Sequence, residues 1–404
     1  MLSTIRRACV TSCAVLVVGV VSVLPVQAAE ETIKIGLTVS LTTDFALAGI
    51  QEKAGVEKAL EEINAAGGIP GKGGNRKIEL VLADNAASPS TAVNAINRVL
   101  ASEPVAVILN IRGTQVLPQM PLIARAGIPA VTITGTRKVT QQGNPWVFRF
   151  YPHDGYGKPA AVKFAVETLK KKQLAILHGA EEFGMSGRDN MLRAMREWYK
   201  MEPVAVESLQ PFDKDFAAQL LNIKKKGADV ILTQTFQAPS ALIQKQARQL
   251  NIGLPFVLVS QAVVLSALNL MDPADIAGQY GETVLLDPAF NPDPKVQAWV
   301  KEMEGRFKFL PDYQAALDYD VMKTLAKVIE LHGPTPQGIQ KGLREIKYQG
   351  LFSTYQADRE QNMNHQFVIV KIDDKKRQVV EVFVKCREDA PEWNAPDDCR
   401  FVKP

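Results

Sequence analysis

Short runs of apolar residues alternate along this chain with longer segments in which apolar residues recur every three or four positions. The short runs, such as 33–39 and 105–109, are rich in Val, Ile and Leu, which is typical of buried strands in a parallel sheet. The longer segments, such as 49–65, have the period of amphipathic helices. One strand followed by one helix, repeated many times, predicts βαβ units and an α/β fold.

The expected elements form two series, separated by a turn at 142–145 and a strand-like run at 146–151. The first series has expected strands at 33–39, 77–83, 105–109 and 129–133, and helices at 49–65, 88–101 and 114–126. The second has expected helices at 157–171, 185–200, 216–226 and 239–250, and strands at 174–178, 204–209, 229–234 and 255–260. Two such series predict two doubly wound parallel-sheet lobes instead of one long sheet.

The last third of the chain is less regular and returns to both series. It has an extended segment at 281–286, expected helices at 294–307, 313–332 and 335–347, and expected strands at 366–372 and 379–385. We therefore expect one lobe to comprise 30–150 and 283–352, and the other to comprise 151–282 and 353–404.

The first 28 residues have the three parts of a secretory signal peptide. Arg6 and Arg7 form a positive region, the apolar run at 14–26 is shorter than the roughly 20 residues of a bilayer span, and small residues follow. We expect cleavage after Ala28 or Ala29 and export to the periplasm; an uncleaved N-terminal anchor is the alternative.

Composition and charge are those of an ordinary folded protein. Hydrophobic residues make up 46% and charged residues 22% of the 404 residues, which excludes collagen-like, coiled-coil and largely disordered chains. The formal charge of +4 includes the two arginines of the expected signal peptide. The remaining excess is too small to indicate nucleic acid or an anionic membrane as a partner.

Two cysteines, Cys386 and Cys399, remain once Cys9 and Cys13 leave with the expected signal peptide. An even pair close in sequence in an exported protein predicts one disulfide, worth about 3 kcal/mol by the chain-entropy estimate. A redox pair or a metal site is the alternative.

Sequence signatures of catalysis, cofactor binding and metal binding are missing. The chain has no Gly-x-Gly-x-x-Gly after a strand, no Walker A loop, no Gly-x-Ser-x-Gly elbow and no His-Glu-x-x-His. Its four histidines are scattered, without the spacing of a helical metal site. We therefore expect a binding protein with no cofactor and no metal, and not an enzyme.

The loops after the expected strands carry the candidate ligand-binding residues, because ligands of open α/β sheets bind at the carboxyl ends of the strands. Two adjacent loops of the first series offer a cation, hydroxyls and free amides, which suit a carboxylate. Two loops of the second series offer aromatic rings that can pack on a ligand, and the last strand is followed by a polar, uncharged side chain. These residues are Arg112, Gly113 and Thr114; Gly135 and Thr136; Phe183 and Phe236; and Gln261. Helix capping, surface charge and ordinary packing between lobes are the alternatives.

Several motifs resemble the exported branched-chain amino-acid-binding (leucine-binding) proteins of ABC transporters. They are Ile33-Lys34-Ile35-Gly36 with Ser40, the segment Ile63-Asn64-Ala65-Ala66-Gly67-Gly68-Ile69, Ala83-Asp84-Asn85-Ala86, and Phe212-Asp213-Lys214-Asp215-Phe216. The resemblance covers about 31–370 and implies a type I periplasmic-binding fold, with two lobes joined by three crossovers around a ligand cleft.

Carried over by position, the resemblance gives roles to the candidate residues. The carboxylate-binding loops would be 112–114 and 135–136, and the lid aromatics, often tyrosines in the family, would be Phe183 and Phe236. The position that often supplies an acid for the ligand's ammonium group would be Gln261. An amide there favours a carboxylate with an apolar or aromatic body over an amino acid, although Asp154, Glu181 or Asp318 could supply the charge.

We therefore expect a monomeric periplasmic protein that delivers a small carboxylate-bearing ligand to an inner-membrane ABC permease. A ligand-sensing domain of a membrane receptor is the runner-up, and an exported α/β hydrolase is the third possibility.

Overall fold

The computed structural model describes residues 32–71, 74–210, 212–284, 287–365, 367–373, 376–386 and 399–402, with only the backbone from 376 onward and without the side chains of Asp44 and Ser266. The expected signal peptide lies outside the described residues, as do the side chains of Cys386 and Cys399.

The first sheet is parallel and has the strand order β2-β1-β3-β4-β5. Its strands are β1 (Ile33–Val39), β2 (Ile78–Asp84), β3 (Ala106–Leu109), β4 (Ala130–Thr132) and β5 (Val147–Arg149). The helices that follow them are α1 (Ala46–Ala65), α2 (Pro89–Leu100), α3 (Gly113–Ala126) and the short α4 (Lys138–Gln141).

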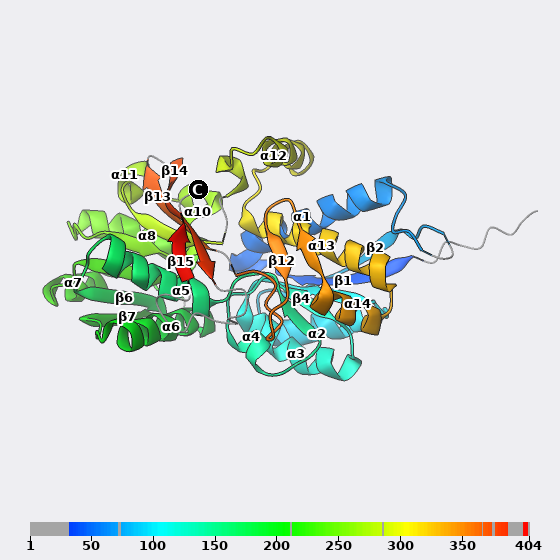
Figure 1. The fold of residues 1–404 in the computed structure, drawn as a ribbon. Coiled ribbons are helices and arrows are strands. Elements are labelled where there is room, and N and C mark those ends of the chain that lie inside the picture. Colours follow the sequence, from blue (N-terminus) through cyan, green and yellow to red (C-terminus); the bar gives the residue numbers. More distant parts are fainter. Residues whose placement is uncertain are drawn as a thin grey trace, which may run out of the picture. The chain divides into compact units, whose positions relative to one another are not determined.

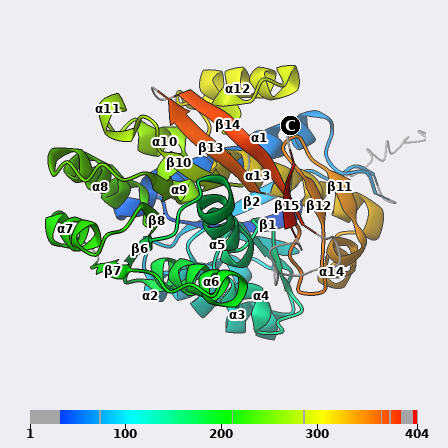
Figure 2. The same ribbon diagram turned by 60° about the vertical axis from the view of Figure 1, so that its left-hand side comes forward.

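The second sheet has the order β15-β14-β13-β10-β9-β8-β6-β7. Its parallel strands are β6 (Leu174–Gly179), β7 (Ala205–Leu209), β8 (Val230–Gln234), β9 (Phe256–Leu258) and β10 (Tyr280–Thr283). Its antiparallel strands are β13 (Phe367–Asp373), which lies beside β10 (Figure 2), and then β14 (Lys376–Cys386) and β15 (Cys399–Val402). Its helices are α5 (Asp154–Lys163), α6 (Glu182–Tyr199), α7 (Ala217–Lys225), α8 (Gln237–Gln249), α9 (Ser260–Val263), α10 (Leu265–Leu268) and α11 (Pro273–Ile276).

Both faces of each sheet are covered, as a doubly wound fold requires. Alternate residues of β3 contribute to two different cores, with Ala106 and Ile108 in one and Val107 and Leu109 in the other. The residues of β6 divide in the same way between two cores. Because every side chain of β3 is buried, the strand is a continuous apolar run. The predicted fold class is therefore confirmed.

The chain passes between the two sheets three times. It leaves the first sheet after β5, returns after β10, and leaves again after the hairpin of β11 (Lys347–Gln349) and β12 (Thr354–Gln356). The returning segment forms α12 (Pro294–Phe307), α13 (Tyr313–His332) and α14 (Pro336–Glu345). Helix α13 packs along α1 (Figure 1), so this segment joins the first sheet's helices. The positions of the lobe boundaries stay a prediction.

Local sequence explains most element ends. Ser88 accepts a hydrogen bond from the N–H of Thr91 and Pro89 follows it, which begins α2. Gly127 ends α3 with a φ of 61°. The helix expected at 157–171 lies about three residues earlier: α5 begins at Asp154, because His153 caps it, and ends at Lys163, where a π-helical turn (Phe164–Thr168) follows.

The close packing of α1 on α13 requires Gly55. A β-carbon at this position would lie 2.1 Å from the carbonyl oxygen of Ala315, which belongs to the backbone of α13 and cannot rotate away. We expect Gly55→Ala to lower the free energy of unfolding by about 1–3 kcal/mol, measured by chemical denaturation. Gly305→Ala in α12, where nothing lies within 4 Å of the new β-carbon, should instead raise it by about 0.5–1 kcal/mol. Equal effects of the two substitutions would contradict this account of the α1–α13 contact.

Candidate functional site

Each sheet has one point at which its strand order reverses. In the first sheet β1 lies between β2 and β3, and in the second β6 lies between β7 and β8. Ligands of open α/β sheets bind outside the carboxyl ends of the strands at such points. The loops after β1 and β3 contain Phe45 and Arg112, and the loops after β6 and β8 contain Glu181 and Phe236.

These four side chains line one cavity of about 240 Å³. Loops of both sheets therefore form its wall. The remaining lining is mostly apolar and includes Phe216 and Leu270. A concave, largely apolar space with a few charged groups is the usual form of a small-molecule site.

Arg112 lies against two aromatic rings that contact each other at the wall of this cavity. Its guanidinium carbon is 4.9 Å from the centre of the Phe45 ring and 5.1 Å from that of Phe236. Phe183 stacks on Phe236, with ring centres 4.8 Å apart. Cation–π attraction and ring packing hold the guanidinium in place. The structure thus brings three predicted site residues together, although Phe183 does not itself line the cavity.

Glu181 faces Arg112 from the second sheet. Its Oε2 accepts a hydrogen bond from the N–H of Gly184, which caps α6. Burial raises the pKa of the Glu181 carboxyl, and the nearby charge of Arg112 acts in the opposite direction. The cavity therefore has one cationic and one acidic group in its wall.

The amides that open α3 lie beside Thr136. A β-carbon at Gly113 would be 2.2 Å from the Thr136 hydroxyl oxygen, so only glycine fits there. Thr136 is fully buried, and its hydroxyl has no hydrogen-bond partner among the described residues. The hydroxyl of the predicted residue Thr114 accepts a hydrogen bond from Gln115 Nε2 at 2.9 Å. Because the first N–H groups of a helix have no intrahelical acceptor, this end of α3 suits an anion.

Gly135, in the loop after β4, lies next to the polar side chains of Asp154 and Tyr151. A β-carbon at Gly135 would lie 3.2 Å from Asp154 Oδ1 and 3.3 Å from the Tyr151 ring. The Tyr151 hydroxyl is 2.6 Å from Ser260 Oγ. Asp154 accepts hydrogen bonds from Ser186 Oγ at 2.8 Å and Gln234 Nε2 at 3.4 Å. These contacts connect the loop after β4 to the second sheet.

Gln261 and Asp318 lie apart from the cavity wall. Gln261 is in α9 and buried, and its Oε1 has no hydrogen-bond partner among the described residues. Asp318 is on α13, fully buried and electrostatically coupled to Glu52 of α1. Burial holds the pKa of both carboxyls well above its usual range. Asp318 is therefore not placed to meet a ligand in this cavity.

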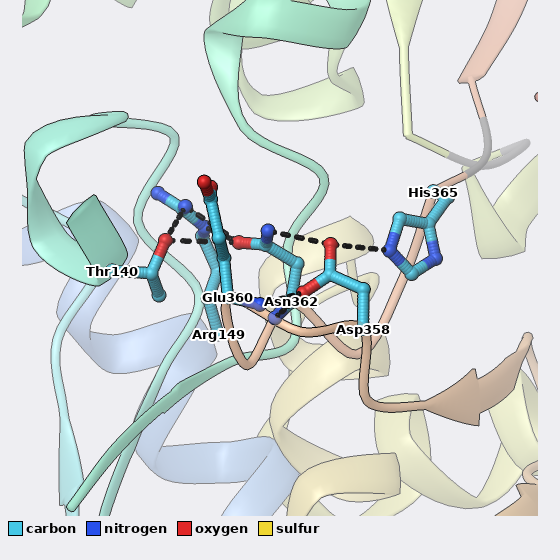
Figure 3. A network of polar contacts seen from close by, with 6 residues as sticks. All are labelled: Thr140, Arg149, Asp358, Glu360, Asn362 and His365. Carbon is cyan, nitrogen blue, oxygen red and sulfur yellow. Dashed lines mark hydrogen bonds and ion pairs between the residues drawn. The ribbon is translucent and has the colours of Figure 1, made fainter. Parts of the chain in front are cut away.

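A buried arginine, Arg149 at the end of β5, is hydrogen-bonded to Thr140 and Asn362 (Figure 3). Its Nη1 donates to the carbonyl oxygen of Thr136 at 2.6 Å, and its Nε and Nη2 donate to Asn362 Oδ1 at 3.0 and 2.6 Å. Its Nη2 also donates to the hydroxyl of Thr140. Burial lowers the pKa of Arg149 to about 10, which leaves the guanidinium charged at neutral pH.

The same network continues into the third passage between the sheets. Asn362 Nδ2 donates to Asp358 Oδ2 at 2.8 Å, and His365 Nε2 lies 3.1 Å from the same oxygen (Figure 3). The ends of β5 and the segment before β13 are thus tied together around one guanidinium.

Sequence reasoning missed two of these residues. Phe45 follows the first strand, so the rule used for the other loops would have selected it. Arg149 gave no such signal, because its partner Asn362 is 213 positions away in the sequence.

This arrangement of sheets and cavity is that of a known protein family. A chain with two doubly wound sheets and an aromatic and cationic cavity between their switch-point loops has the architecture of a two-lobed binding protein. The chain belongs to the periplasmic binding protein family, whose model matches residues 32–377. It is a periplasmic solute-binding protein, and the predicted family and function class are confirmed. Binding, not catalysis, is the function of this family.

Several relatives and solved structures are similar over most of the chain. The leucine-, isoleucine-, valine-, threonine- and alanine-binding protein of Pseudomonas aeruginosa is 28% identical over 78% of this chain and 83% of its own. The isoleucine complex of LivJ from Streptococcus pneumoniae has a TM-score of 0.77 at 22% identity, covering 93% of this chain and all of that one. A Rhodopseudomonas palustris solute-binding protein in complex with benzoate has a TM-score of 0.77 at 16% identity, covering 91% and 99%.

The described part of the chain shows neither a membrane-spanning helix nor a metal site. No helix there combines the length and apolar character that a membrane span needs. No cluster of His, Cys, Asp and Glu there has the form of a metal site.

The buried Asp154 makes stability depend on pH. Burial raises its pKa to about 6, so ionising it in the folded protein costs free energy, although Lys158 acts in the opposite direction. Its contribution is fully present below the unfolded-state pKa and is lost as the pH rises through 6. We expect the wild type to lose about 2 kcal/mol more unfolding free energy than Asp154→Asn between pH 4 and 7, measured by urea titration.

Asp189→Asn, at a carboxyl that is 63% exposed, serves as the control and should follow the wild-type pH curve. A curve for Asp154→Asn parallel to that of the wild type would rule out the buried carboxyl as the source.

Proposed function

We propose that this protein captures a small carboxylic acid with an apolar or aromatic body between its two sheets and delivers it to an ABC importer of the inner membrane. The observation that carries the proposal is Arg112, whose guanidinium lies against the rings of both Phe45 and Phe236 at the wall of a cavity lined from both sheets. Closing the loops of both sheets around one ligand is the hinge motion that such proteins use.

The carboxylate end of the ligand would pair with Arg112. A guanidinium in a largely apolar space forms strong, bidentate hydrogen bonds with a carboxylate. The amides of Gly113 and Thr114 at the start of α3, and the amides and hydroxyls at Gly135 and Thr136, would complete the receptor. The free hydroxyl of Thr136 beside Gly113 supports this arrangement.

The body of the ligand would pack against phenyl rings. Phe45 and Phe236, the latter stacked on Phe183, have no hydroxyl groups, so this part of the site gains by burying apolar surface. The benzoate complex of the R. palustris protein and the 3,4-dihydroxybenzoic acid complex of a second R. palustris protein support an aromatic acid.

Ligands without an amine are favoured because, among the described residues, Glu181 is the one acid in the cavity wall and its charge already faces Arg112. Gln261 is an amide and lies apart from this wall, so it supplies no charge to an ammonium group, whose burial would be costly. Both oxygens of Asp154 already accept hydrogen bonds from neighbouring side chains.

A hydrophobic amino acid is the second candidate ligand, and Glu181 is the observation that favours it. This carboxylate lies in the cavity wall near Arg112, so the two charges could match a zwitterion. The P. aeruginosa relative's name, which includes leucine, isoleucine and valine binding, agrees with such a ligand.

We also propose that the chain is exported by a signal peptide cleaved after Ala28 or Ala29, and that it acts as a monomer. Membership of a periplasmic family supports the export.

Replacing Arg112 should weaken ligand binding strongly. We expect Arg112→Gln to cost about 2–5 kcal/mol of binding free energy, because a desolvated ion pair is lost. That corresponds to tens- to thousands-fold in affinity for benzoate or for deaminated leucine, measured by titration calorimetry. Arg125→Gln, in the last turn of the same helix and exposed, should have no effect.

The same titrations separate the two ligand classes. We expect each deaminated acid to bind at least as tightly as its amino acid, for leucine and for phenylalanine. Much tighter binding of the amino acids, reduced in Glu181→Gln, would show that Glu181 holds the ammonium group and that the carboxylic-acid reading is wrong.

The proposed disulfide should be present in protein from an oxidising compartment. The backbone register places Cys386 directly opposite Cys399 in the β14–β15 pair. Directly opposite residues have Cα atoms about 4.5–5.5 Å apart, within the range of a disulfide. Reduction should lower the free energy of unfolding by about 3 kcal/mol without abolishing ligand binding. Two free thiols in non-reduced mass spectrometry would contradict the pairing.

A further inference from the structure

The residues that line the cavity differ in chemistry and in exposure. Arg112 and Glu181 provide its charged groups. The rest of its lining includes the side chains Leu47, Phe212 and Leu270, which are 43%, 86% and 57% exposed. Large apolar side chains that are exposed together around one cavity mark a binding surface more often than chance. We call Leu47, Phe212 and Leu270 the apolar rim.

The backbone holds Phe212 in an unusual conformation. Its φ is 73°, in the left-handed region that residues with a β-carbon rarely adopt. A turn fixes it there: the N–H of Gln210 donates to Asp213 Oδ2 at 2.8 Å, and the N–H of Asp213 donates to the Gln210 carbonyl at 3.2 Å. Strained residues of this kind cluster at ligand sites. An exposed phenyl ring held by strain at a cavity mouth therefore has a use beyond packing.

Residues that follow strands of both sheets form the apolar rim, just as Arg112 and Glu181 come from loops of different sheets. Leu47 is in α1, which follows a strand of the first sheet, while Phe212 and Leu270 follow strands of the second. Phe216, which is fully buried, lies between the rim and the core of the second sheet and also lines the cavity. A ligand that reaches the rim would be held by both sheets at both of its ends.

We propose that the natural ligand is an elongated acid, with its carboxylate at Arg112 and an aryl or alkyl extension that reaches the apolar rim. The inference rests on the proposed function and deepens it. A single ring next to Arg112 would leave the rim in water. An extension of several carbons would cover it and would gain free energy in proportion to the apolar area buried.

The test is a titration of the wild type with benzoate, phenylpropanoate and phenylpentanoate, which share the carboxylate and the ring but differ in length. We expect affinity to rise along this series, and Phe212→Ala to weaken phenylpentanoate by about tenfold while leaving benzoate unchanged. Phe212→Gly should have the same effect; since glycine adopts a positive φ without strain, a folding defect could not explain it. Leu221→Ala, at a side chain that is 48% exposed in α7 and outside the cavity, is the matched control.

The outcomes separate this inference from the proposed function. If all three acids bind with the same affinity, or if neither Phe212 variant distinguishes them, the elongated ligand is wrong and the carboxylate site stands. If none of the acids binds, or if Arg112→Gln binds all three as well as the wild type, the proposed function fails and the inference fails with it.

Discussion

One buried guanidinium, that of Arg149, holds together β5, the loop after β4 and the passage that leads to β13. It is fully buried and charged, so every one of its donors needs an acceptor, and it finds them on segments far apart in the sequence. One acceptor is the carbonyl of Thr136, in a loop that we assign to the ligand. Another is Asn362, in the passage that leads to β13. Loss of this charge would leave several buried acceptors unsatisfied at once.

The two sheets have the same arrangement of strands around the point where the strand order reverses, although they are built from different parts of the sequence. In each, the strand order reverses beside the first strand of its series, and the loops at that point contribute to the same cavity. The first sheet contributes the cation and one ring; the second contributes the carboxylate and the other ring. Neither half of the site binds a ligand on both sides by itself, which makes closure of the sheets part of recognition.

The fold could be predicted from the sequence because its elements are defined by local periodicity. The strand Ile33–Val39 and the helices Pro294–Phe307 and Tyr313–His332 have the predicted bounds. Short elements without a full period, such as β11, β12 and α9 to α11, were not found. The candidate site was predicted in part: Arg112 and Phe236 were selected from strand ends, and they line one cavity. Their distance, and the bonds of Arg149 to Asn362, depend on tertiary packing that no local pattern records.

The second sheet has three antiparallel strands at one edge, an extension that the first sheet lacks among the described residues. Its parallel strands are extended by β13, β14 and β15, and the last of these is a strand of only four residues. The family model stops at residue 377, just after β14 begins. An open sheet edge offers unpaired backbone groups to any other chain, and a short terminal strand limits how far a foreign strand could pair with it. β15 therefore covers the edge of β14 at Phe383–Cys386, the four residues with which it pairs.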